Sequence, residues 1–512
     1  MAAEYDAVII GSGMGGLSCA TLLAKEGLKV LICEQSSKPG GYCRNFRRKG
    51  FTFSPAVHFL NEFGPNGQMK DAFQILGIPP QINFCSQEKQ RRIITPYFHL
   101  TLSTDIECFE RDLICCFPKE KLSIRAYIAE CRRLVESLEG LTVQSIEVMS
   151  LKEKLRLLYE GIIRRRSLLR YRRKSGREFL DSHFKDPLLK YLLIFGARKD
   201  GSVFTCAGPV MWAMKGDLCS IEGQGVEALP RLFVKSYKAY GGEIRFNSLV
   251  KKIVVENGEA RGVRLEGGGE IRSRYVISNG DARSTFQHLV GEDLLPERFL
   301  RTLRSKELSG ATFTLYLGVD LDLKEMGFDG AMIRYYPDIV KDPWEEMDKG
   351  GGDLEKGKIA IRMDSIQNPM FAPEGKHTVE ISSSVRFELF TEGDVISPRY
   401  EEIKQEIGDR IMAIAEEVIP GLSKSVVVLD ASTPVTYERE TLNSRGAAMG
   451  WYLSAKEISR FRRQKTPIAN LYQAGHWTFP GGGIPMVILS GITAARLVLK
   501  RMKKKSFFPM GG

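Results

Sequence analysis

The pattern of apolar and polar positions predicts a strand, a helix and a second strand within the first forty residues. Residues 7–10 are all apolar, which is typical of a parallel strand buried on both faces. Residues 15–26 repeat apolar side chains at helical spacing, and Gly27 follows at the position where a helix ends. Residues 29–33 are predicted as a second strand, apolar in all but its first residue, Lys29. The segment therefore predicts a β-α-β unit.

Further along the chain, helical patterns are followed by strand patterns. Residues 124–138 and 151–162 each repeat apolar residues every three or four positions, which predicts two amphipathic helices. Residues 253–277 indicate a small meander whose first turn is Asn-Gly. Residues 312–319 alternate strictly between apolar and polar side chains, as a half-buried antiparallel strand does. The predicted fold class is α/β, with a second domain of the α+β type.

A glycine-rich hexapeptide lies between the first predicted strand and its helix. Its G-x-G-x-x-G spacing permits a tight turn, close approach of backbone to a pyrophosphate, and close helix–strand packing. An acid ends the second strand, where a carboxylate accepts hydrogen bonds from a ribose hydroxyl. Since strand, helix and acid occur together, we predict a dinucleotide site rather than a chance glycine turn. The residues concerned are Gly11, Ser12, Gly13, Met14, Gly15, Gly16 and Glu34.

The segment after Glu34 distinguishes between possible dinucleotides. Gln35 leads through a short polar stretch to a second glycine pair, Gly40 and Gly41. This arrangement resembles the FAD-binding segment of the amine-oxidase and glutathione-reductase superfamily. No second G-x-G-x-x-G follows in the sequence, so no separate NAD(P)H domain is expected. The predicted cofactor is FAD.

Residues 471–487 carry the most specific resemblance. Their sequence, LYQAGHWTFPGGGIPMV, resembles the phytoene desaturase, carotenoid isomerase and retinol saturase group of flavoproteins. In that group the glycine-rich turn lies at the flavin ring, and a middle segment similar to residues 222–253 contacts the adenine. One departure is Tyr42, since many amine-oxidase relatives place Arg there. The further cofactor contacts that the resemblance implies are Gln35, Gly40, Gly41, Tyr42, Val250, Gly475, Gly482, Gly483 and Ile484.

The resemblance also implies a domain organisation. It implies a Rossmann-like FAD-binding domain of the glutathione-reductase/amine-oxidase type, with an inserted substrate domain of antiparallel sheet plus helices. The expected FAD-binding domain comprises residues 1–80, 216–290 and 466–512. The expected substrate-binding domain comprises residues 81–215 and 291–465, and its helical part is the candidate for membrane contact.

The activity implied is that of an FAD-dependent oxidoreductase. The resemblance implies desaturation, saturation or isomerisation of carbon–carbon bonds in an isoprenoid or polyene lipid, by hydride exchange with flavin N5. Two alternatives stay open: an amine-oxidase-like enzyme acting on a small amine, and a non-catalytic isoprenoid-binding protein of the GDP-dissociation-inhibitor type. His58 and His476 fall within flavin-contacting segments and are the catalytic candidates; hydrogen bonding to backbone or flavin is the equal alternative for each. No metal site is predicted, and the electron acceptor or donor is open.

Composition adds the question of partners. The 512 residues carry a formal net charge of +12 in an otherwise average globular composition. Residues 164–177 contribute eight basic side chains without an acid, and residues 500–505 contribute five. Because the first run follows the amphipathic stripe at 151–162, it favours an anionic membrane surface over nucleic acid. A solvated helix face is the alternative.

Location follows from two further patterns. No apolar stretch is long enough to span a bilayer. The N-terminal residues lack the basic start of a secretory signal. We therefore expect a cytoplasmic protein, either free or peripheral on the cytoplasmic face of a membrane.

Overall fold

The first β-sheet has seven strands and brings together distant parts of the chain. The structure is a computed structural model that describes residues 3–64, 67–79, 81–138, 148–163, 170–171, 174–194, 200–216, 218–338, 344, 353–393, 395–455 and 463–502. In the first sheet, β1, β2, β9, β12 and β20 are parallel, and the β10–β12 meander continues it antiparallel. The strands are β1 (Tyr5–Ile10), β2 (Val30–Cys33), β9 (Glu243–Arg245), β10 (Val250–Glu256), β11 (Glu259–Leu265), β12 (Glu270–Ser278) and β20 (Leu471–Gln473).

Both faces of this sheet are covered, which explains its continuously apolar strands. Ala7 and Ile9 pack into one hydrophobic core, while Val8 packs into another on the opposite face. The predicted β-α-β unit is confirmed, and Gly27 follows the first helix in the left-handed conformation. The first core includes residues from α1 (Met14–Lys25), α2 (Met69–Leu76), α10 (Ala228–Ala239) and α17 (Ile484–Arg501), and the second includes residues from the π-helical turn Ser284–Gly291 and from α11 (Glu297–Arg304).

The second sheet also has seven strands, and it is antiparallel except where β14 meets β6. One face carries apolar residues packed against α14 (Tyr400–Val418), and the other face carries polar residues such as Thr314 and Ser382 together with a small apolar cluster around Tyr316. The predicted alternation at 312–319 is confirmed in β13. The strands, in spatial order, are β19 (Val426–Ser432), β13 (Ala311–Val319), β16 (His377–Val385), β15 (Ile359–Arg362), β14 (Ile333–Tyr335), β6 (Lys89–Ile94) and β7 (His99–Ser103).

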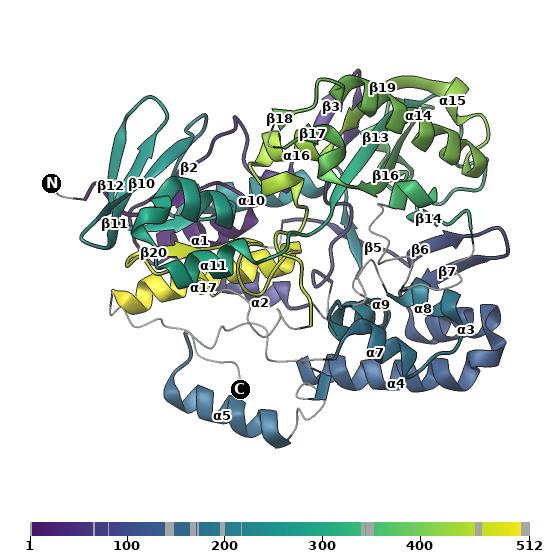
Figure 1. Cartoon of the computed structure of the whole chain (residues 1–512), viewed down its shortest axis with the longest axis horizontal. Helices are drawn as coiled ribbons and strands as arrows, with labels where there is room; N and C mark the ends of the chain where they lie inside the picture. The colour runs from purple at the N-terminus through teal and green to yellow at the C-terminus, as the bar shows by residue number, and fades with distance from the viewer. Residues whose placement is uncertain are drawn as a thin grey trace.

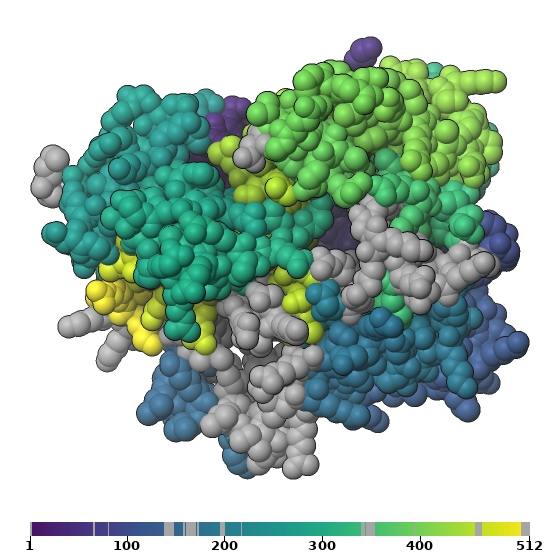
Figure 2. Space-filling view, in the orientation of Figure 1, coloured from purple at the N-terminus to yellow at the C-terminus, as the bar shows by residue number. Residues whose placement is uncertain are grey.

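A helical group adjoins the second sheet, and one helix stands apart from both. Figure 1 shows the first sheet on the left, the second on the upper right and the helical group on the lower right. The predicted stripe at 124–138 lies in α4, where it faces the core of the group. The stripe at 151–162 forms α5 (Leu151–Ile163), at the bottom of Figure 1 and visible as a separate blue surface in Figure 2. The group comprises α3 (Ile106–Cys116), α4 (Lys121–Leu138), α7 (Gly176–Asp181), α8 (Pro187–Leu193) and α9 (Val203–Lys215).

Short elements connect these layers. Within the described residues, none of the helices has the length and apolar character that crossing a membrane requires. The remaining elements are the strand pairs β3 (Phe46–Arg48) with β4 (Phe51–Phe53), β5 (Phe84–Ser86) with β8 (Cys219–Ile221) and β17 (Thr391–Glu392) with β18 (Val395–Ile396), and the helices α13 (Asp364–Gln367), α15 (Leu422–Ser425) and α16 (Pro434–Thr441).

Candidate functional site

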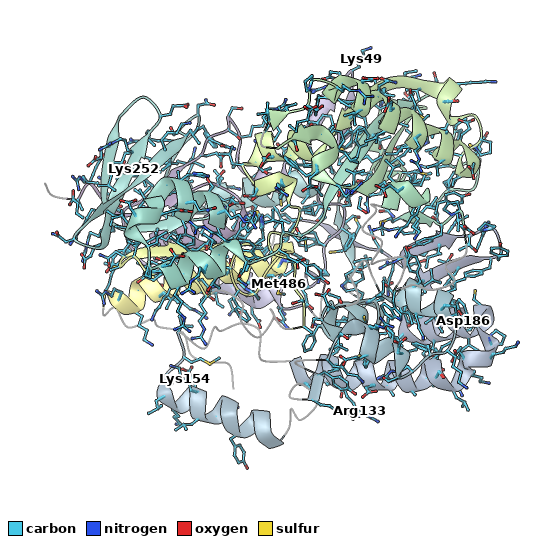
Figure 3. The ribbon with its side chains drawn as sticks, viewed as in Figure 1. Lys49, Arg133, Lys154, Asp186, Lys252 and Met486 are labelled. Carbon is cyan, nitrogen blue, oxygen red and sulfur yellow. The ribbon has the colours of Figure 1, made fainter. Side chains whose placement is uncertain are left out.

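A cavity of about 380 Å³ lies between the two sheets. Four parallel strands of the first sheet end at it, and the residues that follow them, Gly11, Glu34, Asn279 and Gly475, line its wall. Ligands of open α/β sheets bind at this carboxyl edge. The opposite wall includes Thr312, Thr314 and Ser382 of the second sheet. In Figure 3, Met486 marks the beginning of α17 near the middle of the molecule.

The glycine loop leaves no room for side chains. A Cβ atom on Gly13 would lie 2.7 Å from Nδ2 of Asn279, and one on Gly15 would lie 2.7 Å from the backbone nitrogen of Gly475. A Cβ on Gly16 would lie 2.2 Å from the carbonyl oxygen of Gly11. Gly16 therefore permits close contact between helix and strand, while Gly13 and Gly15 keep backbone at the cavity wall.

Two helices begin at the cavity. The N-caps of α1 and α17 are Gly13 and Gly483, and both residues line the cavity without a capping side chain. Neither helix has an acid in its first turn. The free N–H groups and the positive ends of two helix dipoles therefore favour an anionic ligand here.

Glu34 is held at the end of β2 by hydrogen bonds. The backbone N–H and the hydroxyl of Ser12 both donate to Oε2, at 2.7 and 2.6 Å. The N–H of Ser36 donates to Oε1 at 2.9 Å, which leaves acceptor capacity on that oxygen. A fixed carboxylate beside two helix N-termini fits an unphosphorylated ribose joined to a pyrophosphate, so the residues present fit FAD.

Most of the predicted cofactor residues line this cavity. Ser12, Gly16 and Gly482 do not: Ser12 is fully buried against Glu34, Gly16 faces Gly11, and Gly482 packs against Met449. Those three residues lie behind the cavity wall and help to fix its shape. The predicted residues that line the cavity are Gly11, Gly13, Met14, Gly15, Glu34, Gln35, Gly40, Gly41, Tyr42, Val250, Gly475, Gly483 and Ile484.

His476 also lines the cavity, beside Tyr42. The centroids of the two rings are 6.1 Å apart. Burial lowers the pKa of His476 to about 4, so the imidazole is neutral near pH 7. Its Nε2 atom is buried, and no described residue forms a hydrogen bond with it. This nitrogen is therefore a candidate for a hydrogen bond to a bound ligand.

His58 lies on the opposite side of the site, between the main cavity and a smaller adjoining one, and lines both. Its Nδ1 atom is 3.5 Å from Oε2 of Glu380 and 4.0 Å from Oδ2 of Asp364. Burial, with the nearby charges of Arg362 and Arg334, lowers the pKa of His58 well below its ordinary value. This imidazole is therefore also neutral near pH 7.

Several lining residues were absent from the predicted site. Asn279 and Asp281 follow β12, and their position after a predicted strand was the signal that could have found them. Asp364, which lines the smaller adjoining cavity, and Glu380 beside it depend on strand pairing in the second sheet, for which the sequence holds no signal. Thr312 and Thr314, on the polar side of the alternating strand predicted at 312–319, also line the cavity.

Comparisons with known proteins agree with this geometry. Residues 14–499 match the family model described as flavin containing amine oxidoreductase. The chain is 27% identical to a chloroplastic prolycopene isomerase of Daucus carota, over 97% of this chain and 80% of the relative. It is 27% identical to an all-trans-retinol 13,14-reductase of Danio rerio (92% and 82%), and 24% identical to a lycopene-forming phytoene desaturase of Pseudescherichia vulneris (97% and 99%).

A solved structure shares the fold. An oxidoreductase from Methanosarcina mazei superposes with a TM-score of 0.62 at 18% identity, covering 97% of this chain and all of the other. The predicted α/β fold is thereby confirmed.

Proposed function

The chain belongs to the flavin containing amine oxidoreductase family and is an FAD-dependent oxidoreductase, and on that premise we propose that it acts on carbon–carbon bonds of an isoprenoid or polyene lipid. The observation that carries the proposal is one cavity lined both by the dinucleotide-binding strand ends and by the face of the second sheet. Relatives that span nearly the whole chain are named for isomerisation, reduction and desaturation of polyenes. When bound, FAD supplies hydride acceptance or donation at its ring.

We propose specific roles for the residues of the chain. The N-termini of α1 and α17 hold the pyrophosphate and the flavin ring, Glu34 accepts hydrogen bonds from the ribose, and Val250 contacts the adenine. His476 donates or accepts one hydrogen bond at the ring, and His58 faces the substrate from the far wall. Residues 1–80, 216–290 and 466–512 form the proposed cofactor domain, and residues 81–215 and 291–465 the proposed substrate domain.

Anaerobic spectroscopy of the FAD-loaded protein tests the proposal. Loss of the yellow flavin band on addition of a polyene alone supports desaturation. Conversion of the polyene only after dithionite reduction supports saturation or isomerisation. Reduction of the flavin by small amines, with no response to any polyene, would contradict the substrate class, and a protein that binds polyene but no flavin would indicate a non-catalytic binder.

We also propose that α5 brings the protein to an anionic membrane surface. Leu151, Leu155 and Tyr159 follow one another at four-residue spacing, and all three are more than half exposed. Lys152 and Lys154 are exposed beside them, and Figure 3 shows Lys154 on α5. Exposed apolar side chains with neighbouring lysines are typical of helices that lie on a membrane.

The end of α17 adds positive charge to the same surface. A hydrogen bond with Ser150 lowers the pKa of Glu153, and the charges of Arg496 and Lys500 lower it further, so α5 begins close to α17. Most of the basic run at 164–177, and residues 503–505, lie outside the described residues. Within the run, Tyr171 is only 2% exposed, and Arg170 and Lys174 lie over its ring. These side chains therefore contact the protein, and α5 replaces the run as the centre of the proposed surface.

Sedimentation with vesicles tests this surface. Replacing Leu151, Leu155 and Tyr159 by Ser is expected to reduce binding to phosphatidylserine-containing vesicles at least tenfold, because each buried side chain contributes about 1.5–3 kcal/mol. The matched control is Leu122→Ser, an exposed leucine on α4, which should bind like the wild type. Equal binding by all three proteins would contradict the role of α5.

A further inference from the structure

The most unusual group of side chains outside the cofactor cradle joins His58, Asp364 and Glu380. Their ligating atoms lie within 4.8 Å of one another. Glu380 is 2% exposed and lies in the middle of the second sheet, on the polar face that looks toward the cavity. A buried ionisable group without a full set of partners is costly, so its retention calls for a chemical explanation.

Within the cluster, one carboxylate, that of Asp364, is paired with a cation. Arg362 donates to Oδ1 of Asp364 at 2.7 Å and to the backbone carbonyl oxygen of His58 at 3.0 Å. Arg362 and Asp364 therefore neutralise each other and fix the backbone of His58. His58 and Glu380 are left as a second pair, whose protons are not committed to a salt bridge.

The geometry of this second pair suits proton transfer. One oxygen of Glu380, Oε1, accepts the N–H of Ser54 at 2.9 Å and is thereby fixed. The other, Oε2, has no hydrogen-bond partner among the described residues and faces Nδ1 of His58 at 3.5 Å. Nδ1 is also buried, although the His58 side chain as a whole is 23% exposed and lines the cavity. Nε2 is therefore the ring nitrogen available on the cavity side.

Resting on the function proposed above, we propose that His58 exchanges one proton with a substrate carbon and that Glu380 stores that proton through Nδ1. In the saturation direction, Nε2 gives its proton to one carbon of the double bond, whose π electron pair forms the new C–H bond, while the neighbouring carbon takes hydride from the reduced cofactor. The proton on Oε2 of neutral Glu380 passes to Nδ1, so atoms and electrons balance. Desaturation is the reverse and begins with Glu380 ionised.

Neighbouring groups shift the pKa values of Glu380 and His58 in the directions that this exchange requires. Burial, followed by the nearby Asp364 carboxylate, raises the pKa of Glu380 well above its ordinary value, which favours the neutral acid. Arg362 and Arg334 lie close enough to His58 to disfavour a permanent imidazolium. Glu380 therefore holds the proton at rest, and the His58 imidazole passes it to or from the substrate. Two titratable groups whose environments separate their pKa values are typical of such acid–base pairs.

Solvent deuterium distinguishes this role from a structural one. The FAD-loaded wild type, Glu380→Gln and His58→Gln are reduced with dithionite and incubated in D₂O with a polyene that the reduced wild type saturates, and deuterium in the recovered lipid is measured by mass spectrometry. Gln retains the acceptor for Ser54 but cannot store a proton. We expect deuterium incorporation to fall about 10²-fold in both variants, with KM and flavin absorbance unchanged.

A matched control and two opposing results complete the test. Glu417→Gln replaces a carboxylate that accepts the Tyr335 hydroxyl on the apolar face of the same sheet, and it should incorporate deuterium like the wild type. Incorporation by Glu380→Gln within threefold of the wild type would overturn the proposal. So would loss of wild-type incorporation on chelation with recovery on adding Mn²⁺ or Zn²⁺, because the cluster would then be a metal site. A wild type that converts no polyene would refute the proposed function and the relay with it, whereas wild-type conversion with undiminished deuterium incorporation in the variants would overturn the relay alone.

Discussion

Replacing Gly15 by Ala should separate cofactor affinity from folding. The new Cβ atom would lie 2.6 Å from Oδ1 of Asn279 and 2.7 Å from the backbone nitrogen of Gly475, whereas ordinary contacts begin near 3.4 Å. The beginning of α1 must therefore move by about 0.7 Å away from the strand ends. That movement displaces N–H groups that we expect to contact the pyrophosphate.

The size of the effect follows from the cost of overpacking. Strain of about 1–3 kcal/mol in the loop, relieved only by displacing the anion site, corresponds to a Kd for FAD raised about 5-fold to 150-fold. The unfolding temperature of the cofactor-free protein should change little, because Ala favours helix by up to about 1 kcal/mol relative to Gly. Fluorescence titration of the cofactor-free protein with FAD measures the first quantity, and thermal unfolding the second.

A matched Gly→Ala substitution controls for helix propensity. Gly408 lies within α14, where the nearest atom to a Cβ would be Cδ2 of Leu315 at an ordinary 3.6 Å. Gly408→Ala should leave the Kd for FAD unchanged and slightly raise the unfolding temperature. If Gly15→Ala also binds FAD with wild-type affinity, the close approach of α1 to Gly475 does not shape the cofactor site.

Three further outcomes follow. Glu34→Gln should raise the Kd for FAD about 10-fold in the same titration, because three hydrogen bonds to a charged acceptor are weakened; an unchanged Kd would contradict this role. Gly491→Ala should lower the unfolding temperature by several degrees, since its Cβ would lie 2.0 Å from the hydroxyl of Ser18 on α1. An unchanged temperature would mean that α1 and α17 can move apart without loss of stability. The unfolded state protonates His476 near pH 6.5 but the folded state only near pH 4, so stability should fall as pH falls through this window. His476→Gln should reduce that slope by up to about 1.4 kcal/mol per pH unit, and equal slopes would show that the imidazole is not buried neutral.

The parts of the fold that the sequence predicts are those built from neighbouring residues. The strand ending at Ile10, the glycine turn and the helix after it depend on local apolar periodicity and on φ values open to Gly, such as +88° at Gly11. The hairpin at Asn257 and Gly258 is equally local, since both residues have positive φ. Which strands become neighbours is different, because β1 pairs with β12 more than 260 residues later. Only family resemblance anticipated that discontinuous assembly.

The residues of the candidate site also differ in how far the sequence alone could predict them. Gly11 and Glu34, which we propose hold the dinucleotide, follow strands directly and were predictable from that position. Glu380 was not, although its strand alternates visibly between apolar and polar residues. Alternation determines that Glu380 shares a face with Ser382, but its approach to His58 requires β16 to pair with β15 and the loop after β4 to fold over them. The register of the second sheet therefore creates the cluster.

The net charge of +12 suggested a lipid surface through runs of basic residues, and the structure changes which residues support that idea. A run in the sequence says nothing about neighbours in space: Arg177, for example, lies over Trp344 and pairs with Asp181. Cations engaged in this way add little at a membrane, because breaking their contacts offsets the attraction of the lipid. Leu151 and Leu155 are exposed, and their burial in lipid would add apolar transfer energy that salt does not screen. Binding that survives high salt but not the loss of these leucines would therefore distinguish helix insertion from simple attraction between charges.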